Sequence, residues 1–199
     1  MNKIAHIFSW VFSPVLIPTY AIFMVLWVSV LAILPVPVRW NVVAMIWLLT
    51  CIIPVVAIIV LYKMKIISHP GLNNRNERYI PYIITTLCYL AGAWYLMRIH
   101  APHWVYMFLV GGAGAAALSL VINRWWKISA HGAAIGGLLA LAFRIMTDGM
   151  GIIDMWPVIT AAILCTGFLG TSRILLHCHT FWQVMAGIAN GFLWVYILT

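Results

Sequence analysis

The sequence predicts an all-α membrane protein, a polytopic membrane helical bundle with about six to seven transmembrane helices, formed by a single domain over residues 1–199. Composition is the first reason, because 65% of the residues are hydrophobic and only 7% are charged, far from the profile of a soluble domain. The second reason is that apolar runs of about 20 residues, the length of a membrane helix, follow one another along the chain. These runs leave no room for a separate soluble domain.

The expected helices are apolar runs bounded by charged residues and prolines. The first run is too long for a signal-peptide core and lacks a small-residue cleavage site, so we expect a retained span. The region of Pro14 and Pro18 is alternatively a separate interfacial turn, and the fifth and sixth runs are short for a full crossing. In chain order, the expected spans are residues 7–34, 41–62, 80–97, 104–122, 131–146, 155–169 and 181–198.

Small and aromatic residues have expected places in such a bundle. The segments "GGAGAAA" at 111–117 and "GAAIGG" at 132–137 favour close packing of helices, with a permeation path as the functional alternative. Trp125, Trp126 and Trp182 are typical of an aromatic belt at the head-group level. They are equally placed to flank a lipid that enters between the helices.

Basic residues gather on one face of the membrane if each run crosses once. The connections at 62–79, 123–132 and 171–179 then share a face, opposite those at 35–40, 98–104 and 148–157. The first face carries a single acid, Glu77, beside these cations: Lys3, Lys63, Lys65, Arg75, Arg78, Arg124, Lys127 and Arg173. Positive-inside bias accounts for part of this excess. Convergence of three distant connections also predicts a binding site for a multiply charged anion.

The net charge of +8, from 11 basic and three acidic residues, indicates the class of partner. In a membrane protein such an excess favours lipid head groups and phosphates, and we expect no nucleic-acid partner. In "KISAHG", Lys127, Ser129 and His131 precede a glycine-rich helix, whose first N–H groups and positive dipole end favour a phosphate. Arg173 offers a fixed fork of donors for phosphate oxygens, whereas Arg124 and Lys127 are either phosphate ligands or lipid-facing anchors.

Two histidines complete a candidate reaction. His179 begins the last helix and Gln183 lies one turn later, so the amide can hydrogen-bond one imidazole nitrogen and leave the other free. A histidine oriented in this way can take a phosphoryl group as a covalent intermediate. His131 would protonate the leaving alkoxide as general acid. This chemistry requires no metal and no cofactor, because cations and helix-start amides stabilise the transferring group.

These residues resemble the signature of the type 2 phosphatidic acid phosphatase (PAP2) superfamily of membrane phosphatases, which has the blocks K-x6-RP, PSGH and SR-x5-H-x3-D. "SRILLHCHTFWQ" resembles the third block at Ser172, Arg173 and His179, with Gln183 in place of the aspartate. The spacing of the block is kept, and its acidic residue is not.

The other two blocks are less complete. "ISAH" at 128–131 is similar to the second block at Ser129 and His131, with Ile128 in place of proline and alanine in place of glycine. "NNRNERYIP" at 73–81 offers Arg75 and Arg78 for the first block, without its lysine and without a proline directly after either arginine. The resemblance covers roughly residues 63 to 190.

The resemblance implies a lipid phosphatase of the bacterial inner membrane, in which His179 is the nucleophile and His131 the proton donor. Ser129 and Arg173 would bind phosphate, and Arg75, Arg78 or Lys127 would replace the missing lysine. The implied substrate is a phosphomonoester or diphosphate of a lipid, of the phosphatidate, phosphatidylglycerophosphate, isoprenyl diphosphate or lipid A type. Family members usually place this site on the outer side of the membrane, whereas the positive-inside rule places it in the cytoplasm.

Two alternatives stay open at this point. Because Gln183 orients a histidine without adding charge, the protein is alternatively a catalytically weak relative that binds anionic lipid as a receptor, scaffold or transporter. "HCH" at 177–179 alternates His and Cys, as a metal site would, although no carboxylate joins it on that face.

Overall fold

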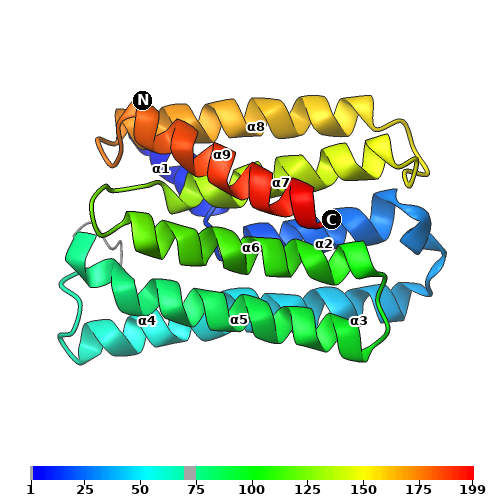
Figure 1. Ribbon diagram of the computed structural model, residues 1–199, viewed down its shortest axis with the longest axis horizontal. Helices are drawn as coiled ribbons and strands as arrows, with labels where there is room; N and C mark the ends of the chain where they lie inside the picture. The colour runs from blue at the N-terminus through cyan, green and yellow to red at the C-terminus, as the bar shows by residue number, and fades with distance from the viewer. Residues whose placement is uncertain (1, 70–74) are drawn as a thin grey trace.

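The computed structural model describes residues 2–69 and 75–199, and in these residues the protein is an all-α bundle (Figure 1). One isolated antiparallel bridge joins Ser29 to Gly151. In chain order, the helical segments are α1 (Asn2–Val11), α2 (Ile17–Val28), the 3-10 turn η1 (Val30–Ile33), α3 (Val36–Trp47), the π-turn η2 (Leu48–Ile52), α4 (Ile53–Lys63), the 3-10 turn η3 (Arg75–Arg78), α5 (Tyr79–Arg98), α6 (His103–Ile122), α7 (Ala130–Thr147), α8 (Trp156–Leu175) and α9 (Phe181–Leu198).

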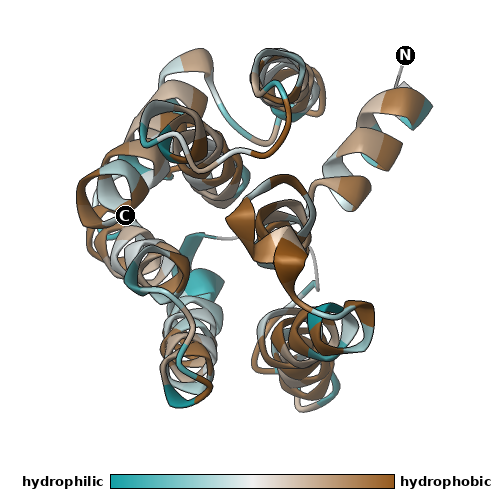
Figure 2. Cartoon of the chain, turned by 90° about the vertical axis from the view of Figure 1, so that its right-hand side faces the viewer, coloured by the Kyte–Doolittle hydropathy of each residue, from teal (hydrophilic) through white to brown (hydrophobic). Residues whose placement is uncertain are grey.

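The described residues include six stretches that are long and apolar enough to cross a membrane, which makes the chain a multi-pass membrane protein. Seen end-on in Figure 2, most of the ribbon is coloured hydrophobic, and α1 stands at the periphery beside the N-terminus. The predicted helical bundle is therefore confirmed. The six stretches are Val36–Lys63, Arg75–Arg98, His103–Ile122, Ala130–Thr147, Trp156–Leu175 and Phe181–Leu198.

The prediction of one span over residues 7–34 is wrong, because the chain breaks between α1 and α2. Pro14 lies in the break, and Pro18 lies at the start of α2, where its missing N–H leaves no hydrogen bond unmade. With 12 residues, α2 is about 18 Å long, shorter than the hydrocarbon core of a bilayer. The alternative of an interfacial turn near these prolines describes the structure better.

The second span runs through α3, η2 and α4 as one continuous stretch with a widened turn. Pro54 has no N–H and crowds the turn before it, and the helix responds by shifting to π-type bonding, with the N–H of Ile53 donating to the carbonyl of Leu48. The hydroxyl of Thr50 donates to the carbonyl of Ile46 at 2.8 Å. The proline is thus accommodated within the span.

Helices α7 and α9 pack with their backbones almost in contact. A Cβ placed on Gly132 would lie 2.8 Å from the carbonyl oxygen of Val184, and one on Gly191 would collide with the carbonyl of Ala133. Small residues allow this approach, as the segment 132–137 predicted. The contact brings the start of α7 beside the start of α9, and these two starts carry the candidate catalytic residues.

We expect Gly191→Ala to lower the stability of the bundle by about 1 to 3 kcal/mol, because the new methyl group meets the backbone of α7 and cannot rotate away. The measurement is the thermal unfolding midpoint in detergent micelles. Gly167→Ala in α8 is the matched control, since a Cβ there has nothing within 4 Å, and it should leave the midpoint unchanged or slightly raised. Equal midpoints for the two variants would contradict the close contact.

Candidate functional site

The three basic connections meet at one end of the bundle, which lies at the left of Figure 1. There the Asn123 side-chain amide donates to the carbonyl of Arg75 at 3.0 Å, and the Arg75 guanidinium donates to the carbonyl of Trp125 at 3.0 Å. Arg78 donates to the carbonyl of Ile128 at 3.4 Å. The grouping of these connections, predicted from alternate crossings, is confirmed, although residues 70–74 lie outside the described part of the chain.

Ser129 caps the start of α7. Its hydroxyl oxygen accepts from the N–H of Gly132 at 3.1 Å, and its own N–H donates to the carbonyl of Gln183 at 3.2 Å, which ties the start of α7 to α9. The residue is fully buried. Because a hydroxyl that accepts at oxygen still has its proton, Ser129 can donate one further hydrogen bond at the start of the helix.

His179 is fixed at the start of α9 by two oxygen atoms. Its Nδ1 lies 3.3 Å from Oε1 of Gln183 and 3.3 Å from the carbonyl of Lys127. The N–H of Thr180 donates to the same Oε1 at 3.1 Å, within a capping box. Since both partners of Nδ1 are acceptors, Nδ1 carries the proton and Nε2 has a free lone pair. This geometry follows the i, i+4 spacing of His179 and Gln183.

Arg173 lies in the last turn of α8 and not in a loop, so the prediction that this span ends at residue 169 is wrong. The helix continues to Leu175 because no proline or glycine interrupts residues 171–175. Arg173 as a whole is 9% exposed. Nη1 of its guanidinium donates to Oγ of Ser9 at 2.6 Å, and its Nε is buried without a hydrogen-bond partner. A buried guanidinium with an unused donor is suited to an anion.

His131, in the first turn of α7, also meets Ser9. Its Nε2 lies 3.2 Å from the carbonyl oxygen of Ser9 and 3.5 Å from its hydroxyl. A carbonyl only accepts, so Nε2 of His131 carries a proton and donates it. Ser9 is a site residue that sequence reasoning missed, because it was placed inside an ordinary apolar span.

The electrostatic environment of the site is strongly positive. Burial first, and then the positive charges around it, lower the pKa of His179 from 6.5 to about 3, so the ring is neutral at physiological pH. Burial and the charge of Arg78 also lower the pKa of Lys127. A neutral imidazole with a free Nε2, surrounded by cations, has the protonation state that nucleophilic attack on phosphorus requires.

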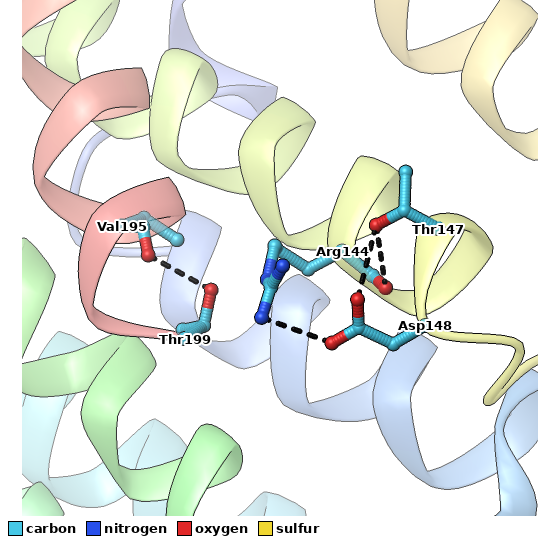
Figure 3. A network of polar contacts seen from close by, with 5 residues as sticks. All are labelled: Arg144, Thr147, Asp148, Val195 and Thr199. Carbon is cyan, nitrogen blue, oxygen red and sulfur yellow. Dashed lines mark hydrogen bonds and ion pairs between the residues drawn. The ribbon is translucent and has the colours of Figure 1, made fainter.

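Two of the three acids of the chain lie at the end of the bundle opposite the site. The Glu77 carboxylate accepts from the backbone N–H and hydroxyl of Ser68 at 2.7 and 2.9 Å. At the opposite end of the bundle, Asp148 pairs with Arg144 at 2.9 Å, close to the C-terminus of α9 (Figure 3), and Asp154 caps the start of α8. An anion brought by a ligand would add negative charge beside the buried cations of the site.

The predicted site residues divide into those that the structure gathers and those that it leaves aside. Arg75 braces the connection between α6 and α7, and Arg124 is exposed and bonded to none of the other site residues in the described chain. Trp125, Trp126 and Trp182 are exposed at this end of the bundle. The structure gathers Arg78, Lys127, Ser129, His131, Arg173, His179 and Gln183.

The described part of the structure gives no support for a metal site at residues 177–179. His177 is exposed in a left-handed conformation with φ 52°, while His179 is buried. Over residues 2–69 and 75–199, no three His, Cys, Asp or Glu side chains form a group of the kind that holds a metal ion. Nitrogen cations, hydroxyls and backbone N–H groups dominate this end, and these donors select anions.

Comparisons of the chain with models of protein families, with curated proteins and with solved structures find no match. The geometry of the site and the spacing of its motifs are therefore the grounds for a functional assignment.

The low pKa of His179 predicts an acid-sensitive fold. The unfolded chain takes up a proton near pH 6.5 and the folded chain only near pH 3, so the free energy of unfolding falls as the pH drops through this window. Between pH 7 and 5 the loss is about 2 kcal/mol. Unfolding of wild type and His179→Gln in phosphate-free buffer measures it, and we expect the variant to lose less stability on acidification. Parallel profiles would contradict a neutral, desolvated His179.

Proposed function

We propose that this protein is a lipid phosphatase, acting on a phosphomonoester or diphosphate of a lipid through a phosphohistidine at His179. One observation carries the proposal: Nδ1 of His179 is held by Gln183 and the Lys127 carbonyl, so that Nε2 offers its lone pair among buried cations. The position at one end of a bundle of membrane helices favours a substrate whose chain stays in the bilayer.

The reaction follows from the roles of the gathered residues. Nε2 of His179 attacks the phosphorus atom as the bond to the leaving oxygen breaks. With the anionic substrate bound, His131 acts as the imidazolium: the proton on its Nε2 passes to the leaving oxygen and the ring becomes neutral. Arg173 and the N–H groups at the start of α7 bind the equatorial oxygens. Water then attacks the phosphohistidine and gives its proton back to His131. The products are inorganic phosphate and either the lipid alcohol, from a phosphomonoester, or the lipid monophosphate, from a diphosphate.

The proposed substrate class includes phosphatidate, phosphatidylglycerophosphate, isoprenyl diphosphate and lipid A-type phosphates, which share a phosphate group at the membrane surface. The exposed Trp125, Trp126 and Trp182 at this end favour a lipid that passes between aromatic side chains. The resemblance to bacterial members of the PAP2 superfamily makes the bacterial inner membrane the proposed location.

We expect purified protein to release phosphate from one of these lipids in micelles that contain a metal chelator, and His179→Ala to abolish the release, because it removes the nucleophile. His177→Asn is the matched control, since residue 177 is exposed and asparagine tolerates its positive φ. A colorimetric phosphate assay makes the measurement. Release that survives His179→Ala, or that stops with chelator, would rule out this mechanism.

Gln183 supports a second candidate function, the binding of anionic lipid without turnover. The amide orients His179 but does not stabilise the imidazolium that forms when Nε2 is phosphorylated, as a carboxylate would. A protein with this site would hold a phosphate lipid as a receptor, scaffold or transporter. The two candidate functions therefore predict different effects of placing a negative charge at residue 183.

Gln183→Asp is expected to raise the rate of phosphate release on the order of tenfold or more, because the carboxylate stabilises the cationic phosphohistidine. Gln183→Asn is the control, since asparagine matches the shape of aspartate without its charge, and it should give no gain. Single-turnover measurement of phosphate release separates this effect from binding. Absence of turnover in wild type and Gln183→Asp, with phosphate lipid still bound, would favour the binding function.

A further inference from the structure

Helix α1 is short and amphipathic, as helices at a membrane surface are. With 10 residues it is too short to cross a bilayer, and its two faces differ. Ile4, Ile7 and Trp10 are 65%, 61% and 80% exposed, whereas Ala5 and Ser9, one turn apart, are buried against the bundle. The outer face therefore suits lipid, and the inner face covers the candidate site.

Ser9 is hydrogen-bonded to both the phosphate ligand and the proton donor of the proposed reaction, Arg173 and His131. Its hydroxyl accepts the 2.6 Å hydrogen bond from Nη1 of Arg173, and its carbonyl accepts the proton of Nε2 of His131. While these bonds persist, His131 cannot give that proton to a leaving oxygen. The arrangement shown is thus one in which α1 holds the phosphate ligand and the general acid in an unproductive pairing.

Ser9 satisfies Arg173 only in part. A neutral hydroxyl carries no charge to balance the guanidinium, and Nε of Arg173 remains buried without a partner. A phosphate group offers a charged oxygen to Nη1 and a second one to Nε, which makes it the better ligand for a planar fork. Exchange of Ser9 for a phosphate oxygen would therefore be favourable at Arg173.

The attachment of α1 permits such an exchange. The helix packs mainly on α8, where the rings of Phe8 and Phe168 lie 5.7 Å apart, and it joins α2 through the irregular residues 12–16. The Tyr89 hydroxyl anchors this connection by donating to the carbonyl of Pro14 at 2.9 Å. Because α1 packs mainly on one helix and its connection to α2 is anchored, α1 can move away while the rest of the bundle keeps its packing.

We propose that α1 is a lid over the phosphate site and that Ser9 is a placeholder for the phosphate group of the ligand. Binding replaces the Ser9 hydroxyl on Arg173 with a phosphate oxygen, displaces α1 and frees the proton of His131. This inference rests on the proposed function, because it takes Arg173 as the phosphate ligand and His131 as the proton donor.

The displacement of α1 is tested by the chemical reactivity of residue 9. In a variant with the four native cysteines replaced by alanine, Ser9→Cys should react slowly with a maleimide, and about tenfold faster with saturating dioctanoyl phosphatidate, as expected for opening of a buried position. Dioctanoylglycerol, which lacks the phosphate, should have no effect. Inorganic phosphate alone shows whether the anion suffices without the lipid chain. Trp10→Cys, on the exposed face, should react at one rate throughout.

Binding of phosphatidate and inorganic phosphate to the same protein is measured by equilibrium dialysis. This measurement tests the phosphate site independently of the displacement of α1. Binding with unchanged reactivity of Cys at position 9 would overturn the lid and leave the phosphate site standing. Absence of binding of either probe would overturn both the site and its lid. Binding together with faster reaction supports both.

Ser9→Ala gives an independent test, because the proposal predicts whether the affinity for phosphatidate rises or falls. If Ser9 competes with the ligand, the dissociation constant for phosphatidate should fall about tenfold, since a hydrogen bond to a charged group no longer opposes binding. Ser13→Ala, in the connection after α1, should leave it unchanged. Weaker binding by Ser9→Ala would show that Ser9 supports the ligand and is not its placeholder.

Discussion

The contact between α7 and α9 is the constraint on which the site depends. Gly132, Gly187 and Gly191 let the two backbones meet, and the N–H of Ser129 can then donate directly to the carbonyl of Gln183. The same approach places the carbonyl of Lys127 against His179. Two motifs about 50 residues apart in sequence thus become one site because small residues remove the space between their helices.

The site concentrates positive charge on buried side chains, which water solvates poorly. Arg78 and Arg173 are nearly buried, and Asp148 and Asp154 lie at the other end of the bundle. Buried charge is costly unless it is compensated, so an arrangement of this kind is expected where an anionic ligand completes it. Burial first, and then these cations, keep His179 neutral by lowering its pKa.

Two parts of the structure followed from the spacing of residues within a helix and from the alternate crossing of successive spans. They are the i, i+4 relation of His179 and Gln183 and the gathering of the three basic connections. Ser9 was not predictable in the same way, since a serine in an apolar run carries no signal of its own and its partners lie 122 and 164 positions away. Only the alternation of Ala5 and Ser9 with Ile4, Ile7 and Trp10, before Pro14, hints at an amphipathic surface helix.

Glutamine at position 183 has two opposite effects relative to a carboxylate, one on binding of an anion and one on the charge of His179. Oε1 of Gln183 already serves two donors, the N–H of Thr180 and Nδ1 of His179, so the capping and the orientation need only an oxygen. A carboxylate in the same place would add a negative charge among the cations and weaken their attraction for a phosphate. A carboxylate would also stabilise the cationic phosphohistidine of the proposed reaction. In the proposed reaction, the neutral amide would therefore favour binding of the anionic substrate but would not stabilise the cationic phosphohistidine.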